Sequence, residues 1–306
     1  GSNIGGNAAD ISISANRTNN KLTYVDATQG WVKTNDDTGT VPSYTSATGG
    51  TITNSGNYRI HTFNSSSNFV VASIGNTDGS GAKVSYLVVA GGGGGGEGGG
   101  GAGGYREGKD SPKDSYTASP LAATDSGLTI SAQTYPITVG AGGNGQAHSS
   151  GGLKGSNSTF STITSTGGGG GGPAPNPRVL GGSGGGREPG VPVSCQSGNH
   201  PPVSPPQGNP GGVQGNNSNP GRHGGGGGAG EAGCTDGSAH GGDGVSSQIT
   251  GSAVTRAGGG GGGYSSAGAP LGGAPGGDGG GGNGSTTDGT NATGSNLGGG
   301  GGGGWN

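Results

Sequence analysis

Apolar and β-branched residues gather in short groups within the first ninety residues, and their spacing is that of strands. The groups occupy residues 58–63, 68–74 and 83–90 and are separated by Asn, Ser and Gly. Because such residues favour strands and the separators favour turns, the pattern predicts a small β-sandwich-like part. Further strands are predicted at 127–131, 134–139, 158–164 and 252–255. Since Pro136 cannot donate a ladder hydrogen bond, its strand is predicted at an edge or a bulge.

A separate group of strand formers lies at residues 21–33, where Leu22, Tyr24 and Val25 are followed by turn residues and then by Trp31 and Val32. This order predicts a β-hairpin. A lone hairpin is marginal in water, and other copies in an oligomer could support it. We therefore divide the chain into a stalk or attachment segment at 1–46 and a glycine-rich domain at 47–306. The start without Met indicates a fragment or a processed product.

After residue 90 the pattern is replaced by contiguous glycine. The runs lie at 91–96, 98–101, 167–172, 184–186, 224–228, 258–263, 279–282 and 298–304. Flexible linkers are one interpretation. However, the runs are similar in length, nearly free of serine, and recur through one domain. Glycine can form the polyproline-II helix, whose backbone groups all point outward, and helices packed side by side can pair these groups. We therefore favour a bundle of polyglycine-II helices.

Energetics require that such a bundle have interior members. Fixing a glycine backbone costs roughly 1–2 kcal/mol or slightly more, whereas a net hydrogen bond returns only about 0.5–1.5 kcal/mol. Isolated pairs of helices would melt, and a helix bonded on several sides would not. The fold class is thus mostly β plus irregular structure, with long loops and essentially no α-helix. The scaffold residues chosen to represent the bundle are Gly91, Gly94, Gly169, Gly226, Gly261 and Gly301.

Polar segments between the runs are predicted to be loops at the ends of the bundle, a typical binding architecture. They span 105–126, 144–156, 187–223, 231–251, 264–278 and 283–297. The longest contains eight prolines, which stiffen it. Tyr105, Tyr264 and Trp305 each adjoin a glycine run and could cap it or contact a receptor; a cap is favoured for Tyr105. The predicted receptor-contact residues are His200, Pro201, Pro202, Arg222, His223, Tyr264 and Trp305.

Composition narrows the possible functions. The 306 residues include 87 Gly, without the Gly-X-Y period of collagen. Charged residues are 9% and the net charge is −3, so a basic surface for nucleic acid is missing. The longest apolar run, 87–90, is far too short for a membrane span. We expect neither nucleic acid nor membrane insertion.

Catalytic and cofactor patterns are weak. Gly-x-Gly-x-x-Gly carries no information in such a chain, and no Walker motif is present. The five His are dispersed and expected to be exposed, and no metal-binding spacing occurs. We expect no enzyme activity, no cofactor and no metal. Cys195 and Cys234 could form a disulfide contributing roughly 3–4 kcal/mol, or remain two thiols in a reducing cytosol.

Several motifs resemble, in combination and order, the glycine-rich domain of bacteriophage tail-fibre proteins. They are YLVVAGGGGGG at 86–96, GGAGGYR at 100–106, YPITVGAGG at 135–143 and GSNSTFSTITSTG at 155–167. YVDATQGW at 24–31 resembles the hairpin that often precedes that domain. The resemblance implies stacked polyglycine-II helices with receptor-binding loops at a tip, as in distal adhesins of T-even-type phages, and a homotrimer. It also implies a closing strand of the type GIVIVRY, which is missing after Gly304.

The resulting hypothesis is a virion tail-fibre domain that binds a bacterial surface glycan or outer-membrane protein. An alternative is a repeating subunit of an extracellular filament, in which an open β edge exchanges strands between subunits. A further alternative is an ice-binding polyglycine bundle, against which the long proline-rich loop argues.

Overall fold

The computed structural model divides into two compact units. It describes residues 22–27, 30–33, 43–76, 81–123, 125–147, 150–172, 180–187, 196–213, 222–235, 239–264 and 273–305. One unit contains Gly1–Ser46 and Ala72–Ala82, and the other contains Ala47–Val71 and Lys83–Asn306. The described residues form sixteen strands and no helix. The prediction of a mostly β and irregular chain is therefore confirmed.

The first unit contains the hairpin predicted at residues 21–33. Strand β1 (Leu22–Asp26) pairs antiparallel with β2 (Gly30–Lys33), and Tyr24 lies opposite Trp31. Their ring centroids are 5.6 Å apart in an edge-to-face arrangement. Such a pair adds about 0.5–1.5 kcal/mol beyond its buried area, so the two aromatic residues help to fix the register of the hairpin.

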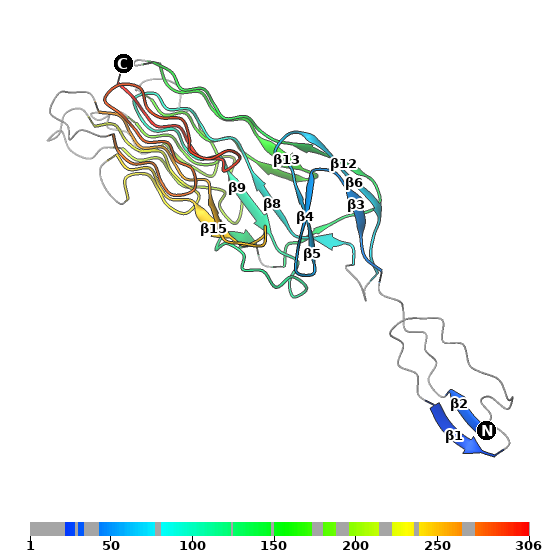
Figure 1. Ribbon diagram of the computed structural model, residues 1–306. Helices are drawn as coiled ribbons and strands as arrows, with labels where there is room; N and C mark the ends of the chain where they lie inside the picture. Colours follow the sequence, from blue (N-terminus) through cyan, green and yellow to red (C-terminus); the bar gives the residue numbers. More distant parts are fainter. Residues whose placement is uncertain are drawn as a thin grey trace. The chain divides into compact units, whose positions relative to one another are not determined.

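The largest sheet of the second unit has five strands in the order β14-β13-β12-β6-β3 (Figure 1). In β6, Phe69 and Val71 are buried whereas Val70 is exposed, so alternate residues face a core. The strands are β3 (Ser46–Thr48), β6 (Ser67–Ser73), β12 (Thr134–Thr138), β13 (Ser158–Phe160) and β14 (Ile163–Ser165).

The core on this sheet is formed by Ala47, Phe69, Val71, Ile130 and Tyr135. Val84 and Leu128, from the short pair β7 (Lys83–Val84) and β11 (Leu128–Thr129), pack against it from a second layer. This two-layer packing is the sandwich-like part. The other strands are β4 (Thr51–Ser55) with β5 (Tyr58–Thr62), β8 (Tyr86–Val89) with β9 (Tyr105–Gly108) and β10 (Ala122–Ala123), and β15 (Val245–Ser247) with β16 (Val254–Arg256).

Two details of the strand prediction were wrong. Strand β12 lies inside the sheet, not at its edge, but Pro136 pairs only with Asn68 of β6 because the ladder to β13 begins at Ile137. The missing proline N–H is therefore tolerated. The single strand predicted at 158–164 is the hairpin β13–β14, which turns at Ser161 with φ 52°.

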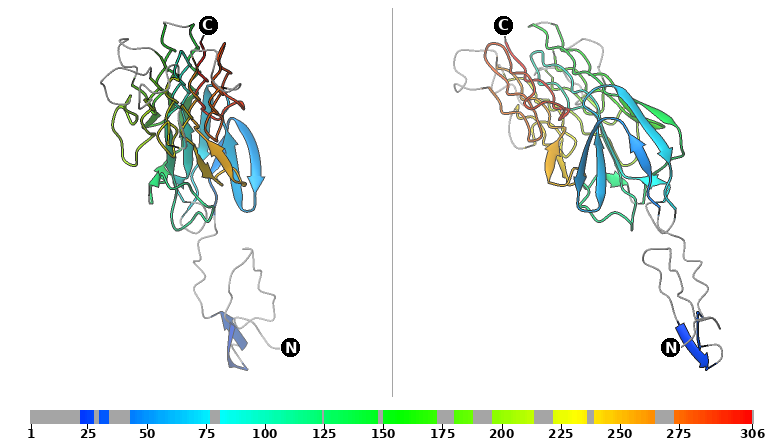
Figure 2. Two further views of the ribbon diagram at one scale, coloured as in Figure 1. Left: turned by 90° about the vertical axis from the view of Figure 1, so that its left-hand side faces the viewer. Right: turned by 45° about the vertical axis from the view of Figure 1, so that its right-hand side comes forward.

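Beyond β8 the chain forms glycine-rich segments that lie side by side, as Figures 1 and 2 both show. The amides of Gly99 and Ala102 donate to the carbonyl oxygens of Gly224 and Gly227, at 3.0 and 2.9 Å. The same neighbour is thus contacted at every third residue, the repeat of a helix with three residues per turn. The spacing recurs where Gly168 and Gly171 donate to Gly91 and Gly94, and where Gly143 and Gln146 donate to Gly92 and Gly95.

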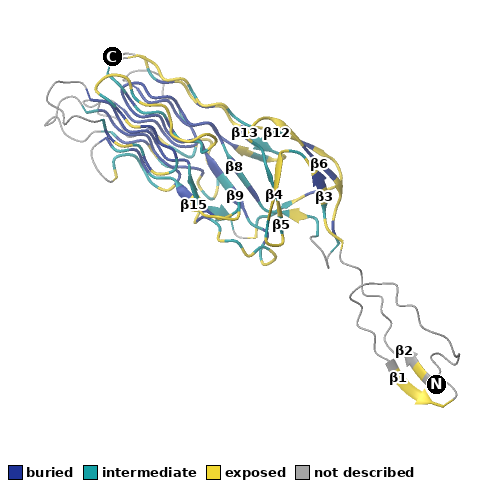
Figure 3. Cartoon of the chain, in the orientation of Figure 1, coloured by how far each residue is buried: buried dark blue, intermediate teal, exposed yellow. Residues whose placement is uncertain are grey.

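One segment, residues 98–104, lies at the centre of this bundle and is buried throughout (Figure 3). We call it the central segment. Its backbone is hydrogen-bonded to six others: residues 90–96, 166–172, 181–187, 222–228, 257–264 and 298–305. Six neighbours around one axis are the hexagonal packing of polyglycine-II helices. The multiple bonding that the energetic argument required is present.

The interior leaves no room for a side chain. A Cβ on Gly226 would lie closer than 3.0 Å to the carbonyl group of Gly100, and one on Gly261 would meet the carbonyl of Ala274. Predicted scaffold residues Gly91 and Gly94 are closed in the same way by Ala141 and Asn144, and Gly169 is bonded to Gly101 and Ser183. Gly301 is less confined, since its nearest neighbour, Gly95 N, is 3.2 Å from the added Cβ.

Several predicted loops contain bundle segments instead. Residues 150–156, 207–213, 239–244, 273–278 and 283–290 all hydrogen-bond laterally to glycine runs, and the loop predicted from residue 105 begins as β9. These segments form outer positions of the bundle, where only the inward-facing residue must be glycine. In 150–156, for example, Gly152 and Gly155 face other backbones while Leu153 is exposed.

Candidate binding surface

The bundle has two different ends. At the sheet end, segments join strands: β8 leads into residue 90, residue 104 into β9, and residue 244 into β15. At the other end, which we call the distal end, direct bridges link Gly172 to Arg187, Arg187 to Val213, and Arg222 to Tyr264. Each of these five residues adjoins a chain segment outside the described residues. The distal end is therefore where five described segments meet.

Arg222 and Tyr264 form one pair on the distal end. The Arg222 guanidinium carbon is 5.2 Å from the centre of the Tyr264 ring, and their backbones form an antiparallel bridge. A cation over an aromatic face is worth about 0.5–1 kcal/mol when exposed and more when desolvated. Tyr264 is only 5% exposed, so the ring itself is a platform under Arg222 and offers little surface to a receptor.

Glu97, His223 and Trp305 form a second group at this end. His223 Nδ1 lies 3.5 Å from Glu97 Oε2, and the indole of Trp305 stacks on the imidazole with centroids 5.4 Å apart. The backbone fixes both partners, because Gly263 donates to the Glu97 carbonyl and accepts from the His223 amide. The expectation that His223 is exposed was wrong: it is 2% exposed, since Glu97 and Trp305 enclose it.

Arg187 is a further charged residue of the distal end. It is 5% exposed, and its Nε and Nη1 atoms make no hydrogen bond. Sequence reasoning missed both Arg187 and Glu97 as site residues. The available signal was their position: Glu97 interrupts two glycine runs, and Arg187 directly follows a third.

The other predicted contact residues lie at the opposite end of the bundle. The amide of His200 donates to Gly181, beside Gly182, whose amide donates to Gly167 just after β14. His200, Pro201 and Pro202 are exposed. They therefore lie at the other end of the bundle from Arg222, Tyr264 and Trp305.

This sheet-end turn is held by two amide side chains. Asn199 bonds the backbone of Val203 and Gln207 through its Oδ1, and its Nδ2 donates to Val203. Gln207 is fully buried; its Oε1 accepts from the Thr166 amide at 2.9 Å and its Nε2 donates to the Pro201 carbonyl at 3.0 Å. The turn is thus an ordered part of the bundle.

Tyr105 closes the sheet end of the central segment. It is 1% exposed and packs with Ala102, Ala229 and Ala257, as a cap would. Its hydroxyl donates to Glu107 Oε2 at 2.8 Å. Burial, and then the nearby Glu107 carboxylate, raise the pKa of Tyr105. The hydrogen bond between Tyr105 and Glu107 is therefore a buried polar contact that holds the sheet end of the central segment in place.

Glu107 is otherwise satisfied by strand β15 and the chain before β10. Ser247 Oγ donates to its Oε1 at 2.7 Å, and the Ser119 amide donates to its Oε2 at 3.0 Å. Nearby, burial lowers the pKa of the Arg256 guanidinium. Both carboxylate oxygens of Glu107 accept hydrogen bonds, so Glu107 joins three parts of the chain.

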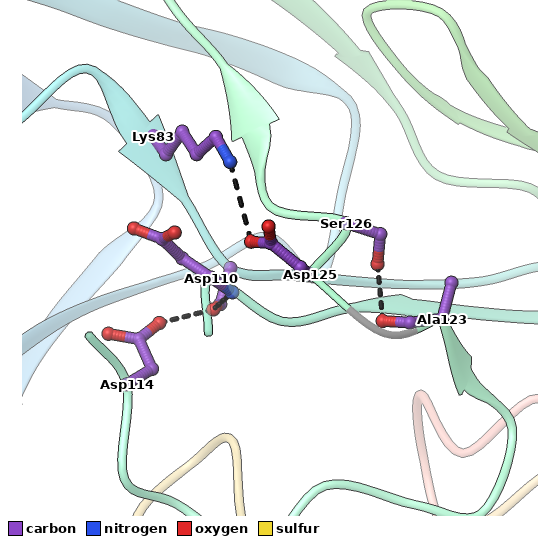
Figure 4. Close-up of polar contacts among 7 residues, drawn as sticks. Lys83, Asp110, Asp114, Ala123, Asp125 and Ser126 are labelled. Carbon is purple, nitrogen blue, oxygen red and sulfur yellow. Dashed lines mark hydrogen bonds and ion pairs between the residues drawn. The ribbon is translucent and has the colours of Figure 1, made fainter. Parts of the chain in front are cut away.

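Three aspartates lie near β7, but they do not form a metal site (Figure 4). Asp125 pairs with Lys83 at 3.4 Å, Asp114 accepts from Ser85 Oγ, and the Asp110 amide donates to the same Oγ. Within the described ranges, no group of three or more His, Cys, Asp or Glu could hold a metal ion. Cys195 falls outside these ranges, so the disulfide with Cys234 remains a prediction.

Comparison with known proteins identifies the class. The family model of the glycine-rich domain matches residues 71–306, most of the chain, and the protein belongs to this family. No curated protein and no solved structure matches it. The part of the chain that the structure describes contains no helix that could cross a membrane.

Proposed function

We propose that the protein is an adhesive fibre domain, in which the polyglycine-II bundle is a rigid scaffold and the distal end binds a host cell. One observation carries this proposal: Gly172, Arg187, Val213, Arg222 and Tyr264 meet at one end of the bundle and bring two arginines and an aromatic ring together there. Rigid scaffolds that present variable segments at one end are typical of recognition proteins. The proposed contact residues are Arg222 and Trp305.

The resemblance to bacteriophage tail fibres extends the proposal to the partner. The domain would lie on a virion, outside the host, and its receptor would be a surface glycan or an outer-membrane protein. The Trp305 side chain is partly exposed and stacks on His223, which follows Arg222 in the sequence. Aromatic and arginine side chains are enriched at binding hot spots, so this corner of the distal end is the proposed centre of contact.

Oligomerisation is part of the same proposal. In the outer segment 140–146, Gly142 and Gly145 are exposed, and an added Cβ would meet its nearest atom at 3.7 and 3.4 Å. Their amides donate to no other described residue. Interior packing therefore does not explain these glycines, whereas a neighbouring subunit would. A homotrimer and, as the second candidate, a filament of repeated subunits both use such an edge.

Competition for phage adsorption tests the proposal. The purified chain should block adsorption of the phage that carries it, and trimer mass by light scattering should accompany activity. Substitution of Trp305 by Ala should weaken the block at least tenfold, while Leu153→Ala, on an exposed side of the bundle, should leave it unchanged. Filaments seen by electron microscopy without any effect on adsorption would instead favour the second candidate.

A further inference from the structure

Arg187 is a buried cation whose charge is not compensated within the described structure. Its relative exposure is 5%, and neither Nε nor Nη1 has a hydrogen-bond partner. A guanidinium cannot lose its proton to avoid this burial. Buried charged groups normally have an ion partner, because removing a charge from water is expensive. The Arg187 guanidinium therefore lacks the anionic partner that a buried charge normally has.

The described backbone neighbours of Arg187 supply no acidic partner. Its amide donates to Gly212 at 3.1 Å, its carbonyl accepts from Gly224 at 2.7 Å, and it bridges Gly172. These three glycines, and Val213, which also bridges Arg187, have no carboxylate. The backbone of Arg187 is firmly held, whereas Nε and Nη1 of its guanidinium have no hydrogen-bond partner.

The buried acid at this end, Glu97, lies beside His223. Glu97 is 3% exposed and lies 3.5 Å from His223 through its Oε2. Neither Arg187 nor Arg222 forms an ion pair with a described residue. This positive charge favours an anionic ligand over a neutral one.

We infer that the distal end contains an anion-binding site centred on Arg187, which takes a carboxylate or phosphate group. Guanidinium donors match both groups in geometry and form charge-assisted hydrogen bonds with them. The inference deepens the proposed function and rests on it for the source of the anion: an acidic sugar or a phosphate of a surface glycan. A free phosphate ion would have the same chemistry.

Thermal unfolding of the whole chain, in phosphate-free buffer and with added inorganic phosphate, tests the site. Phosphate should raise the Tm of the wild type with a saturable dependence on concentration. Arg187→Met should lose this shift and, in phosphate-free buffer, should have a higher Tm than the wild type, because an uncompensated buried charge has been removed. Arg59→Met, at an exposed position, should keep the wild-type shift.

Two outcomes would overturn the inference: an equal phosphate shift in the wild type and Arg187→Met, or a lower Tm of Arg187→Met without phosphate. If that variant does not fold, the phosphorus NMR line of phosphate can be followed with the wild type alone, and an unbroadened line would also overturn it.

Binding to oligosaccharides distinguishes the two sources of the anion. A galacturonic acid oligomer should bind the wild type at least tenfold more tightly than a glucose oligomer, and Arg187→Met should abolish the difference. Phosphate binding without acidic-sugar binding would leave a free-ion site. If the chain binds phosphate through Arg187 but does not block phage adsorption, the anion site stands and the proposed function is refuted. If the chain blocks adsorption but binds no anion through Arg187, the proposed function stands and the anion site is refuted.

Discussion

The amide of Gly100 donates a hydrogen bond of 2.8 Å to the carbonyl oxygen of Gly301, and the Gly100 carbonyl accepts one of 2.9 Å from Gly260. The central segment, which comes early in the glycine-rich domain, is therefore hydrogen-bonded to segments from the end of the chain. Contacts so distant in sequence can form only after most of the chain has been ordered. We expect the bundle to unfold as one cooperative unit.

Interior and exterior glycines should respond in opposite ways to alanine. Gly226→Ala places a methyl group against the Gly100 carbonyl, and we expect a loss of at least about 1–3 kcal/mol, the usual range for overpacking. The matched control is Gly142→Ala, whose methyl group has room. It should be neutral or stabilise the isolated chain by about 0.5–1 kcal/mol. Urea unfolding measures both, and equal tolerance would refute the packing requirement.

Amide hydrogen exchange should map the hexagonal packing. The Gly100 and Gly101 amides are buried and bonded, to Gly301 and Gly169, and should exchange only when the bundle opens globally. The exposed amides of Gly142 and Gly145 donate to no described residue and should exchange within seconds. Slow exchange at those two residues that persists at high dilution would contradict the edge position of segment 140–146.

Contiguous glycine predicts the inner segments of the bundle but not the outer ones. The runs predicted the inner members of the bundle, because the central segment is glycine at every position except Ala102 at its sheet end. Outer segments were missed, since only one residue in three faces inward: Gly152 and Gly155 do so, while Leu153 is exposed. Glycine at every third position was the available signal.

The candidate site could be predicted only in part. Tyr264 and Trp305 were placed at the ends of glycine runs and do lie at the distal end, but the direction of each segment could not be deduced. Residues 166–172 and 181–187 run parallel, as the bridge between Gly172 and Arg187 shows, although they follow each other closely in the sequence. Which end receives His200 depends on this direction, and composition does not encode it.

The buried phenol of Tyr105 should make the protein sensitive to alkali. Burial raises its folded-state pKa above the unfolded value of 10.0, so the unfolded chain releases this proton first as the pH rises. Stability should therefore be complete below about pH 10 and fall above it. Tyr105→Phe should reduce the slope, while costing about 0.5–3 kcal/mol at neutral pH through the hydrogen bond lost by Glu107. Tm measured against pH tests both; Tyr44→Phe, at an exposed position, is the control.

Substitutions at the two ends of the bundle should have separate effects, one on stability and the other on receptor binding. Gln207→Ala removes the acceptor of the buried Thr166 amide, and leaving a buried donor unsatisfied costs about 1–3 kcal/mol. Because Gln207 lies at the sheet end, the fraction that remains folded should still block phage adsorption fully.

Trp305→Ala loses one stacked ring at the edge of the distal end and should have the reverse effect, with near-normal Tm and weak blocking. Adsorption assays normalised to folded protein, with Gln133→Ala at an exposed position as control, measure the difference. If Gln207→Ala also abolished blocking by its folded fraction, receptor contact would have to be placed at the sheet end, with the exposed His200 and Pro201.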